Sequence, residues 1–330
     1  MIPKFDSLVQ VLSGTKPWQQ LNEQRLKSIR GRIFGWFLGF ALLLLGLSLL
    51  LFGEITSGFG ALVMSVVMVI ISYRITHKQY SEQYKKLVVP PLVSNIITHS
   101  IPLDTLDKKR NRCKFNHQGH IDLDLLLSIP LFQKYDEGII SYHGEDLFSG
   151  TIDKTDFQFS DFVIQKNYDL ILVDQDIDIT TFRGLVFIAD FHKSFDGTTT
   201  LKTRKGKIYK HQTMTGSSMK TASHEFDKMF KISTTDEITG RYLLPANMLE
   251  RIINLRKLFP GQGMAICLHD GMLIISIHGV DFFEAKGLKK LEKQNLLRTY
   301  EEIKAIVEII HLLNLNLRIW NKQKKDFIAK

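Results

Sequence analysis

The sequence has 330 residues, 44% of them hydrophobic, and a formal net charge of +9. It holds only two cysteines, which excludes a disulfide framework and a complete cysteine-based zinc site. The patterns GxxxxGK[ST], GxSxG, HExxH and paired CxxC are absent, so the strongest signatures of nucleotide hydrolases, serine hydrolases, zinc proteases and thiol redox enzymes are missing.

Residues 1–32 are predicted to form a cytosolic segment of one or two short helices. Phe5, Leu8 and Leu12 recur at helical spacing, and Pro17 is suited to begin a second helix.

Residues 33–52 form an uninterrupted apolar run of 20 residues that includes nine leucines and four phenylalanines. At about 1.5 Å per residue such a helix reaches roughly 30 Å, the thickness of a bilayer's hydrocarbon core. A second run, residues 55–73, follows after only Gly53 and Glu54. The two runs predict a transmembrane hairpin. Small residues that repeat every four positions predict where its helices meet: Gly35, Gly39, Ser57, Ala61 and Ser65.

Basic residues flank the hairpin on both sides, whereas the short connection carries only Glu54. The positive-inside rule therefore predicts that both chain termini are cytoplasmic. The basic residues before the first run are Lys27, Arg30 and Arg32, and those after the second are Arg74, Lys78, Lys85 and Lys86. We expect Arg30, Arg32, Arg74 and Lys78 to contact the anionic membrane surface.

Residues 74–115 are predicted to be a helical stalk that is interrupted at Pro90 and Pro91. Near its end, Cys113, His117 and His120 provide three zinc-type ligands within eight residues. Their spacing matches no common zinc pattern, so no metal site is predicted and the three residues are only candidates.

Residues 116–330 are predicted to form one cytosolic domain. From about Gly138 the sequence consists of short strand-like segments that follow each other too closely for crossover helices, which favours antiparallel pairing. These segments are GIISYH, DLFSGTID, FQFSDFVIQ, LILVDQDIDI and GLVFIADF. A hairpin is predicted between Ile266 and His278, because Asp270-Gly271 is a favoured two-residue turn.

Two polar clusters lie in this domain. Asp174, Asp176 and Asp178 imitate the opening of a calcium loop, but Ile179 and Leu185 replace its glycine and glutamate, so a solvated strand is predicted instead. A basic cluster around Gly206 predicts a hairpin tip, either solvated or in contact with phosphate or a lipid surface: Lys202, Arg204, Lys205, Lys207 and Lys210.

Two helices are predicted near the end of the chain. One follows Pro245 and buries Met248, Ile252, Leu255 and Phe259. The other begins with Thr299 and Glu302 in capping-box spacing and continues with an apolar stripe from Ile303 to Leu317. Helices that cover an antiparallel sheet give an α+β domain.

Four segments resemble, in this order, the bacterial family called domain of unknown function 3137: GEDLFSG (144–150), FRGLVFIADFHKSF (182–195), HEFDKMFKI (224–232) and residues 244–255. The resemblance covers roughly residues 70–320. It implies a membrane hairpin joined to a cytosolic α+β domain and a bacterial source, and it supplies no catalytic or binding residues.

Together these features predict a protein of the bacterial inner membrane whose cytosolic domain is a binding or assembly module. The expected partners are the lipid bilayer and another membrane or cytosolic protein. No nucleic acid is expected, because aromatic residues do not alternate with the basic ones, no cofactor is predicted, and the oligomeric state stays open. The alternative is a membrane-bound enzyme that acts on lipid or an anionic metabolite.

Overall fold

The computed structural model describes residues 4–99, 112–135, 139–152, 155–170, 175–191, 193–206, 212–280, 282–285 and 295–313. The chain divides into two units. The helical unit comprises Pro3–Asn95 and Phe283–Glu301, and the sheet unit comprises Ile96–Phe282 and the chain from Glu302 onward. The predicted cytosolic domain, residues 116–330, therefore contributes one segment to the helical unit.

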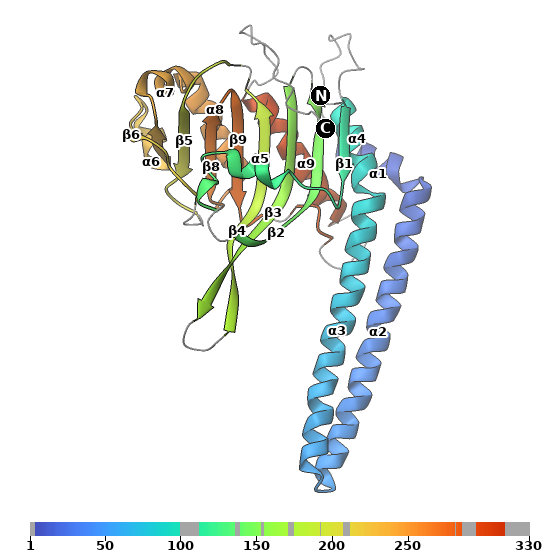
Figure 1. The fold of residues 1–330 in the computed structure, drawn as a ribbon. Helices are drawn as coiled ribbons and strands as arrows, with labels where there is room; N and C mark the ends of the chain where they lie inside the picture. The colour runs from blue at the N-terminus through green and yellow to red at the C-terminus, as the bar shows by residue number, and fades with distance from the viewer. Residues whose placement is uncertain are drawn as a thin grey trace. The chain divides into compact units, whose positions relative to one another are not determined.

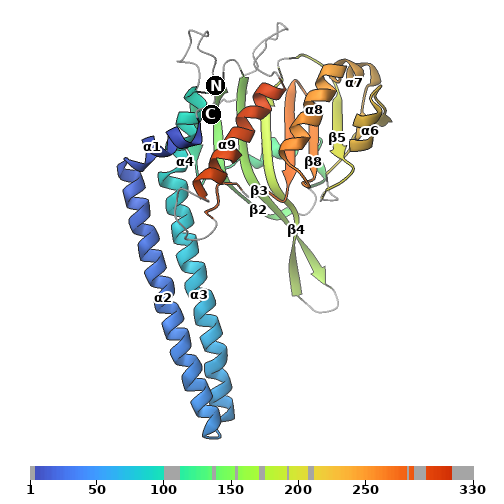
Figure 2. The ribbon, with the colours of Figure 1, turned by 180° about the vertical axis from the view of Figure 1, so that it is seen from behind.

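The helical unit is built on two long helices that lie side by side, α2 (Lys16–Leu51) and α3 (Ile55–Leu87) (Figures 1 and 2). α1 (Phe5–Ser13) precedes them and buries Leu8 and Leu12, as its helical spacing predicts. α4 (Val89–His99) follows α3 after a break at Val88, with Pro90 and Pro91 in its first turn, where proline is tolerated.

Helix α2 differs from the prediction in one respect. Pro17 lies in the first turn of α2, as expected, but the helix then continues without interruption into the first apolar run. The N-terminal segment therefore holds one short helix and the beginning of a long one. The reason is that no proline or helix-ending glycine signal separates Trp18 from the apolar run.

α2 and α3 are both long and apolar enough to cross a membrane. Only 17% and 11% of their most apolar windows are buried inside the protein, which is unlike the core helix of a soluble domain. Small residues let the two backbones approach closely. A Cβ added at Gly39 would lie 3.2 Å from the carbonyl oxygen of Ser65, and one added at Gly46 would lie 3.0 Å from that of Gly58.

The predicted seam between these helices is thus partly right. Gly35, Gly39 and Ser65 are buried in it, whereas Ser57 is exposed and the neighbouring Gly58 takes the position that Ser57 was expected to hold.

The sheet unit contains nine strands in one antiparallel sheet, with the order β1-β2-β3-β4-β9-β8-β5-β7-β6. The strands are β1 (Arg112–Asn116), β2 (Ile139–Ile152), β3 (Thr155–Leu170), β4 (Gln175–Asp190), β5 (Thr198–Thr203), β6 (Ser217–Met219), β7 (Phe230–Thr234), β8 (Met264–His269) and β9 (Met272–His278). The sheet begins within the segment that was expected to be stalk.

The antiparallel prediction is confirmed, but the strands are longer than predicted. GIISYH and DLFSGTID are one strand, β2, whose register shifts between Glu145 and Phe148. LILVDQDIDI and GLVFIADF were expected to be separate, whereas residues 175–190 form the continuous strand β4. Asp176 and Asp178 lie on β4, as the strand interpretation requires, and Asp174 lies outside the described residues.

Helices cover both faces of the sheet. α5 (Leu123–Ser128) and residues 129–135 pack on one face over a core that includes Phe162, Phe182 and Ile274 (Figure 1). α8 (Ala246–Leu258) and the second half of α9 (Asn295–Leu312) cover the other face (Figure 2). α6 (His224–Met229) and α7 (Glu237–Leu243) lie near the β6 edge (Figure 1).

Local signals near the end of the chain are mostly confirmed. Asp270 and Gly271 form the turn between β8 and β9, with φ angles of +46° and +70°. Helix α8 follows Pro245 and buries its predicted face. The capping box at Thr299 is wrong, because α9 already begins at Asn295 and Thr299 lies inside it. Leu317 lies outside the described residues.

Candidate functional site

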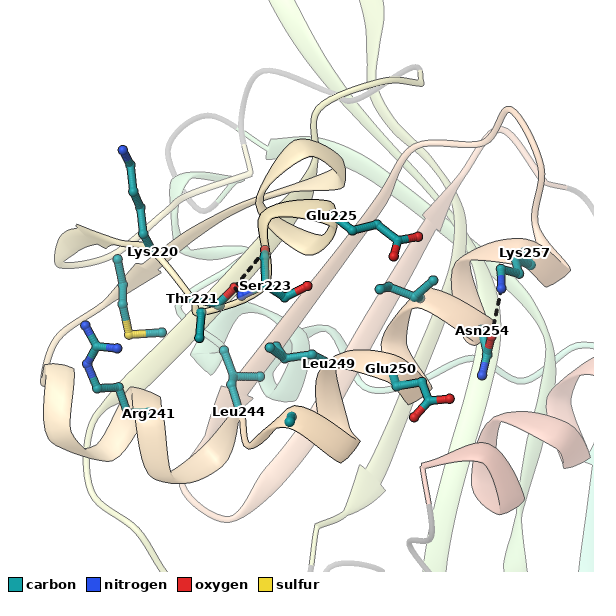
Figure 3. Close-up of a pocket in the computed structure, with 14 residues that line it drawn as sticks. Lys220, Thr221, Ser223, Glu225, Arg241, Leu244, Leu249, Glu250, Asn254 and Lys257 are labelled. Atoms are coloured by element: carbon teal, nitrogen blue, oxygen red, sulfur yellow. Dashed lines mark hydrogen bonds between the residues drawn. The ribbon is translucent and has the colours of Figure 1, made fainter.

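A groove of about 590 Å³ lies in the sheet unit where strand β6 ends and helices α6, α7 and α8 meet (Figure 3). Its apolar lining includes Met219, Leu244, Leu249 and Ile253, each less than a tenth exposed. Its charged lining residues are Lys220, Glu225, Arg241, Glu250 and Lys257. The groove therefore combines an apolar floor with a rim that carries both signs of charge.

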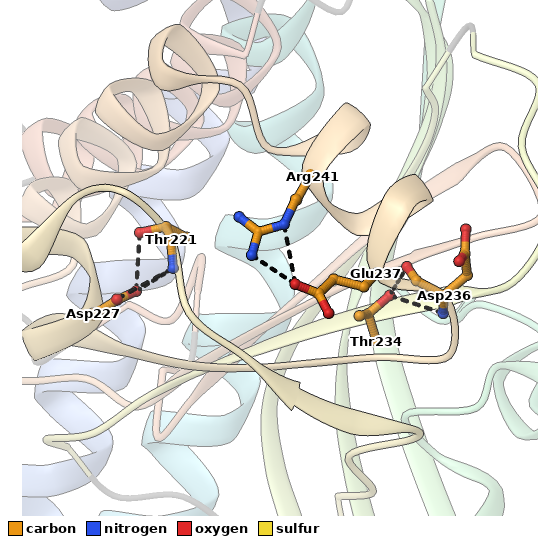
Figure 4. Close-up of polar contacts among 6 residues, drawn as sticks. All are labelled: Thr221, Asp227, Thr234, Asp236, Glu237 and Arg241. Atoms are coloured by element: carbon orange, nitrogen blue, oxygen red, sulfur yellow. Dashed lines mark hydrogen bonds and ion pairs between the residues drawn. The ribbon is translucent and has the colours of Figure 1, made fainter.

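The wall formed by residues 220–229 is held by its own hydrogen bonds. The backbone N–H of Thr221 donates to Asp227 Oδ1 at 3.1 Å, and the Thr221 hydroxyl donates to the same oxygen at 2.9 Å (Figure 4). Ser223 Oγ accepts from the Phe226 N–H at 3.3 Å and so caps α6. These contacts fix the loop in place before any ligand arrives.

The wall formed by α7 is built in the same way. Asp236 caps the helix by accepting from the Thr239 N–H at 2.8 Å, and Thr234 Oγ1 donates to the Asp236 carbonyl at 2.7 Å (Figure 4). Gly240 allows α7 to pack closely, because a Cβ there would lie 3.0 Å from Thr234 Oγ1. Arg241 pairs with Glu237 at 2.6 Å, one turn earlier on the exposed face.

Charged side chains reach the groove from opposite walls. Glu225 projects from α6 and Glu250 from α8 (Figure 3). Lys257 Nζ donates to Asn254 Oδ1 at 3.0 Å at one end of the groove. Lys220 and Arg241 line the other end (Figure 3).

An exposed apolar residue lies beside the groove. Ile238, on α7, is 81% exposed. It lies three residues before Arg241, so both side chains fall on neighbouring positions of the helix surface. Tyr242 on the same helix is also exposed. The large apolar side chains that the sheet unit exposes are, in its described part, Ile238, Tyr242 and Tyr142.

The zinc-type candidates do not come together. Cys113 lies on β1, and burial raises the pKa of its thiol to about 12. The His120 ring contacts the carbonyl of Ile121 through Nδ1 at 2.8 Å and packs edge-on against Tyr142. Over the described residues, no group of three histidine, cysteine, aspartate or glutamate side chains is arranged to hold a metal ion.

The basic cluster around Gly206 is not a hairpin tip. Lys202 lies within β5, which pairs with β7 and β8 rather than with the next strand along the chain. Arg204 is exposed and donates through Nε to the Asp227 carbonyl at 2.7 Å. Lys205 is exposed, and Lys207 and Lys210 lie outside the described residues.

Lys202 belongs to a buried polar network that sequence reasoning missed. Its ammonium donates to the Gln212 carbonyl, Gln212 Nε2 donates to Ser276 Oγ at 2.7 Å, and Gln212 Oε1 accepts from His278 Nε2 at 2.8 Å. Burial, with the nearby Lys231 and Lys134, lowers the pKa of Lys202 to about 8. Burial and Lys202 lower the pKa of His278 to about 3, which keeps that ring neutral.

The basic residues beside the apolar runs lie within the long helices α2 and α3. Arg30 on α2 and Arg74 and Lys78 on α3 are exposed, as contact with a charged surface requires. Arg32 differs, because it is partly buried and its Nε donates to Thr76 Oγ1 of α3 at 3.2 Å. Lys85 is buried and pairs with Glu284 at 2.7 Å.

No short motif marks the groove in the sequence. Ser223 and Asp236 are readable as helix caps, but the spacing of the rim residues follows no catalytic or binding pattern. Only the family resemblance drew attention to residues 224–232, whereas residues 244–255 were also part of the helix predicted after Pro245. Both segments form parts of the groove's walls.

Comparison with known proteins bears on this part of the chain. Residues 180–315 match the family model described as "Protein of unknown function (DUF3137)". The match is shorter than the resemblance in the sequence, and residues 144–150 lie outside it. No curated protein sequence matches the chain.

A crystal structure of the mycobacterial trehalose monomycolate transport factor A, TtfA, is similar to this chain at 8% sequence identity, over 61% of this chain and 88% of that one, with a TM-score of 0.29. A similarity this weak carries no argument about function. The family match covers every residue that lines the groove. The part of the chain that matches the DUF3137 family model, residues 180–315, thus contains the whole groove.

Proposed function

We propose that this chain is an integral protein of a bacterial inner membrane, with both termini in the cytoplasm and a binding module as its sheet unit. The module docks a segment of another protein in the groove of α6, α7 and α8. The proposal has a membrane part and a docking part, which rest on different observations.

The membrane part rests on the apolar surfaces of α2 and α3 and on the charges beside them. Exposed basic residues at both ends of the hairpin, such as Arg30, Arg74 and Lys78, favour the cytoplasmic side. Gly53 and Glu54, which join the helices, carry no positive charge and so suit the opposite side.

The docking part is carried by Ile238, which is 81% exposed on α7, three residues before Arg241 of the groove lining. Burying an isoleucine side chain contributes about 1.5–3 kcal/mol, so a partner that covers Ile238 and fills the groove gains binding energy from both. Charges of both signs on the rim suit a polypeptide that carries both signs itself.

The hydroxyl groups of the groove support binding over nucleophilic catalysis. The Thr221 hydroxyl donates to Asp227, and Ser223 Oγ accepts from the Phe226 N–H. A catalytic hydroxyl needs a base that is free to take its proton. Ser223 Oγ caps a helix instead, and the Asp227 carboxylate beside the Thr221 hydroxyl also accepts from the Thr221 N–H and so holds the loop.

The second candidate is a membrane-bound enzyme that acts on lipid or an anionic metabolite. One observation favours it: three cationic side chains line the groove, Lys220, Arg241 and Lys257. Glu225 and Glu250 on the opposite walls would then be the acid and base candidates.

Site-specific photo-crosslinking in the full-length, membrane-embedded protein tests the docking part. A photoreactive residue at position 238 is expected to capture one discrete partner, and the same residue at Tyr142 is the matched control, because it is also an exposed apolar position of the sheet unit. Ala246→Trp should abolish the product at 238, because Ala246 is exposed and lines the groove, so the indole fills it.

Two results would overturn the docking part. One is a crosslinking pattern at position 238 that Ala246→Trp leaves unchanged. The other is substrate turnover by the purified full-length protein that is lost in Glu225→Gln or Glu250→Gln, which would favour the enzyme instead. The membrane part fails independently if carbonate removes the protein from vesicles, or if a tag at Lys330 is reachable only from outside the cell.

A further inference from the structure

Arg32 occupies an unusual position in the helical unit. It directly precedes the first apolar run, and its guanidinium carbon lies 4.3 Å from the centroid of the Tyr73 ring of α3. Its Nε donates to Thr76 Oγ1, which itself donates to the Ser72 carbonyl at 2.7 Å. The guanidinium is therefore held in one orientation by a ring face and a hydroxyl.

The terminal nitrogens of this guanidinium still need acceptors. Nη2 is buried and makes no hydrogen bond with any residue that the structure describes, and no acidic side chain in that part of the chain pairs with Arg32. Nη1 likewise makes no hydrogen bond with the described residues, but it is not buried, so an external anion can reach it.

The surface beside Arg32 is a hollow of about 600 Å³ on one face of α2. Its lining residues are Ile29, Arg32, Ile33, Trp36, Phe37 and Phe40, which recur three or four residues apart. Trp36, Phe37 and Phe40 are 65%, 76% and 59% exposed. Arg32 is the one charged residue of this lining, at its cytoplasmic end if the termini are cytoplasmic.

The chemistry of the hollow selects its ligand. Because Nε donates to Thr76 and Nη2 is buried, Nη1 is the nitrogen that can donate a charge-assisted hydrogen bond to a phosphate oxygen. The exposed aromatic side chains of the hollow can pack against a long apolar chain that is attached to that phosphate. Trp36 and Tyr73 stand near Arg32, and such rings are typical of the level at which lipid headgroups lie. Lys27 and Arg30, on the same segment, add positive charge and favour a headgroup with net negative charge.

We propose that this hollow binds one anionic phospholipid, whose phosphate accepts a hydrogen bond from Nη1 of Arg32 and whose acyl chain packs on Trp36, Phe37 and Phe40. The inference rests on the membrane insertion proposed above. It goes beyond a general attraction to the membrane surface, because it names one lipid position and the residues that form it.

Native mass spectrometry of the full-length protein, released from nanodiscs of mixed phosphatidylglycerol and phosphatidylcholine, tests the inference. The wild type is expected to retain one phosphatidylglycerol. Arg32→Gln should lower that retention at least about tenfold, since hydrogen bonds to charged groups contribute about 1.5–3 kcal/mol. Arg74→Gln is the matched control, because Arg74 follows the second apolar run on α3 and is exposed, and it should retain the lipid.

Phe37→Ala is a second variant, in case Arg32→Gln disturbs the contact between α2 and α3. Phe37 is exposed, so its loss should leave that contact intact and still weaken lipid retention. Equal retention of the two lipids, equal retention by wild type and Arg32→Gln, or release of a second copy of the chain in place of lipid would overturn the site. Carbonate extraction of each variant separates this outcome from failure of membrane insertion, which would release the wild type as well.

Discussion

Glu284 provides a quantitative test of what holds the helical unit together. Its Oε1 lies 2.7 Å from Lys85 Nζ of α3, and its Oε2 accepts from Ser81 Oγ at 2.7 Å. The Ala285 N–H donates to the same hydroxyl at 3.3 Å. The Lys85 side chain is 4% exposed and the Glu284 side chain 24%. These contacts fasten residues 283–285 to α3.

Glu284→Gln should loosen this segment. The amide keeps the shape of the side chain but replaces two charge-assisted hydrogen bonds, each of which contributes about 1.5–3 kcal/mol, with weaker neutral ones. Because the amide oxygen can still accept one hydrogen bond, we expect a loss of about 2–3 kcal/mol in local stability. That loss corresponds to an opening equilibrium about 30- to 150-fold larger, at 1.4 kcal/mol for each factor of ten.

Hydrogen exchange of the full-length protein in nanodiscs measures this opening, with the Ala285 amide as the direct probe. Glu250→Gln is the matched control, because Glu250 is exposed and belongs to the sheet unit. A double variant, Lys85→Met with Glu284→Gln, should recover part of the loss, since it removes the buried Lys85 charge that Glu284→Gln leaves without its carboxylate. Unchanged exchange at Ala285 in Glu284→Gln would refute the reasoning.

The charge of Glu284 also predicts how the stability of this segment changes with pH. Burial raises the pKa of Glu284, but the charge of Lys85 and the hydrogen bonds from Lys85 and Ser81 outweigh it, so the pKa lies below its ordinary value. A carboxyl whose pKa is depressed by folding stabilises the fold above its unfolded pKa, about 4.3, and loses that contribution as the pH falls through the folded value. Protection of Ala285 should therefore fall in acid in the wild type and much less in Glu284→Gln.

Three further predictions concern the seam, the hairpin and the core. Gly46→Leu should destabilise the protein by about 1–3 kcal/mol, because its Cβ would lie 3.0 Å from the Gly58 carbonyl oxygen, and so lower the thermal midpoint in detergent. Gly60→Leu is the control and should leave the midpoint unchanged, because a Cβ at Gly60 has nothing within 4 Å. Gly271→Ala should cost about 1–2 kcal/mol in urea unfolding, because φ is +70°, and an unchanged midpoint would contradict the turn. Burial raises the pKa of Cys267 to about 12, so iodoacetamide at pH 8 should label it only after unfolding, and rapid labelling of the native protein would exclude this core position.

Local patterns in the sequence determined much of the architecture. Residues 33–52 and 55–73 could be identified as helices long and apolar enough to span a membrane, because hydropathy and length are properties of a single helix. The β8–β9 hairpin follows from Asp270-Gly271, since the turn itself requires positive φ angles. Helix α8 follows from Pro245 and the spacing of its buried residues. In each case the information lies within a few residues of the element it specifies.

Only the tertiary structure decided which distant residues meet. Strand β5 pairs with β7 and β8 rather than with its neighbours along the chain, so Lys202 lies in a buried network instead of a hairpin tip. The long strands β2 and β4 continue through segments that locally resemble turns, because pairing with neighbouring strands satisfies their backbone.

The groove and the Glu284 contacts are also formed by residues that lie far apart in the sequence. Glu225, Arg241 and Glu250 come from three helices that no common motif links, and Glu284 reaches Ser81 across 203 positions of sequence. The sequence by itself thus determined the elements and their class. The assembly of the candidate sites depended on long-range packing, which burial and hydrogen bonding decide only once the chain has folded.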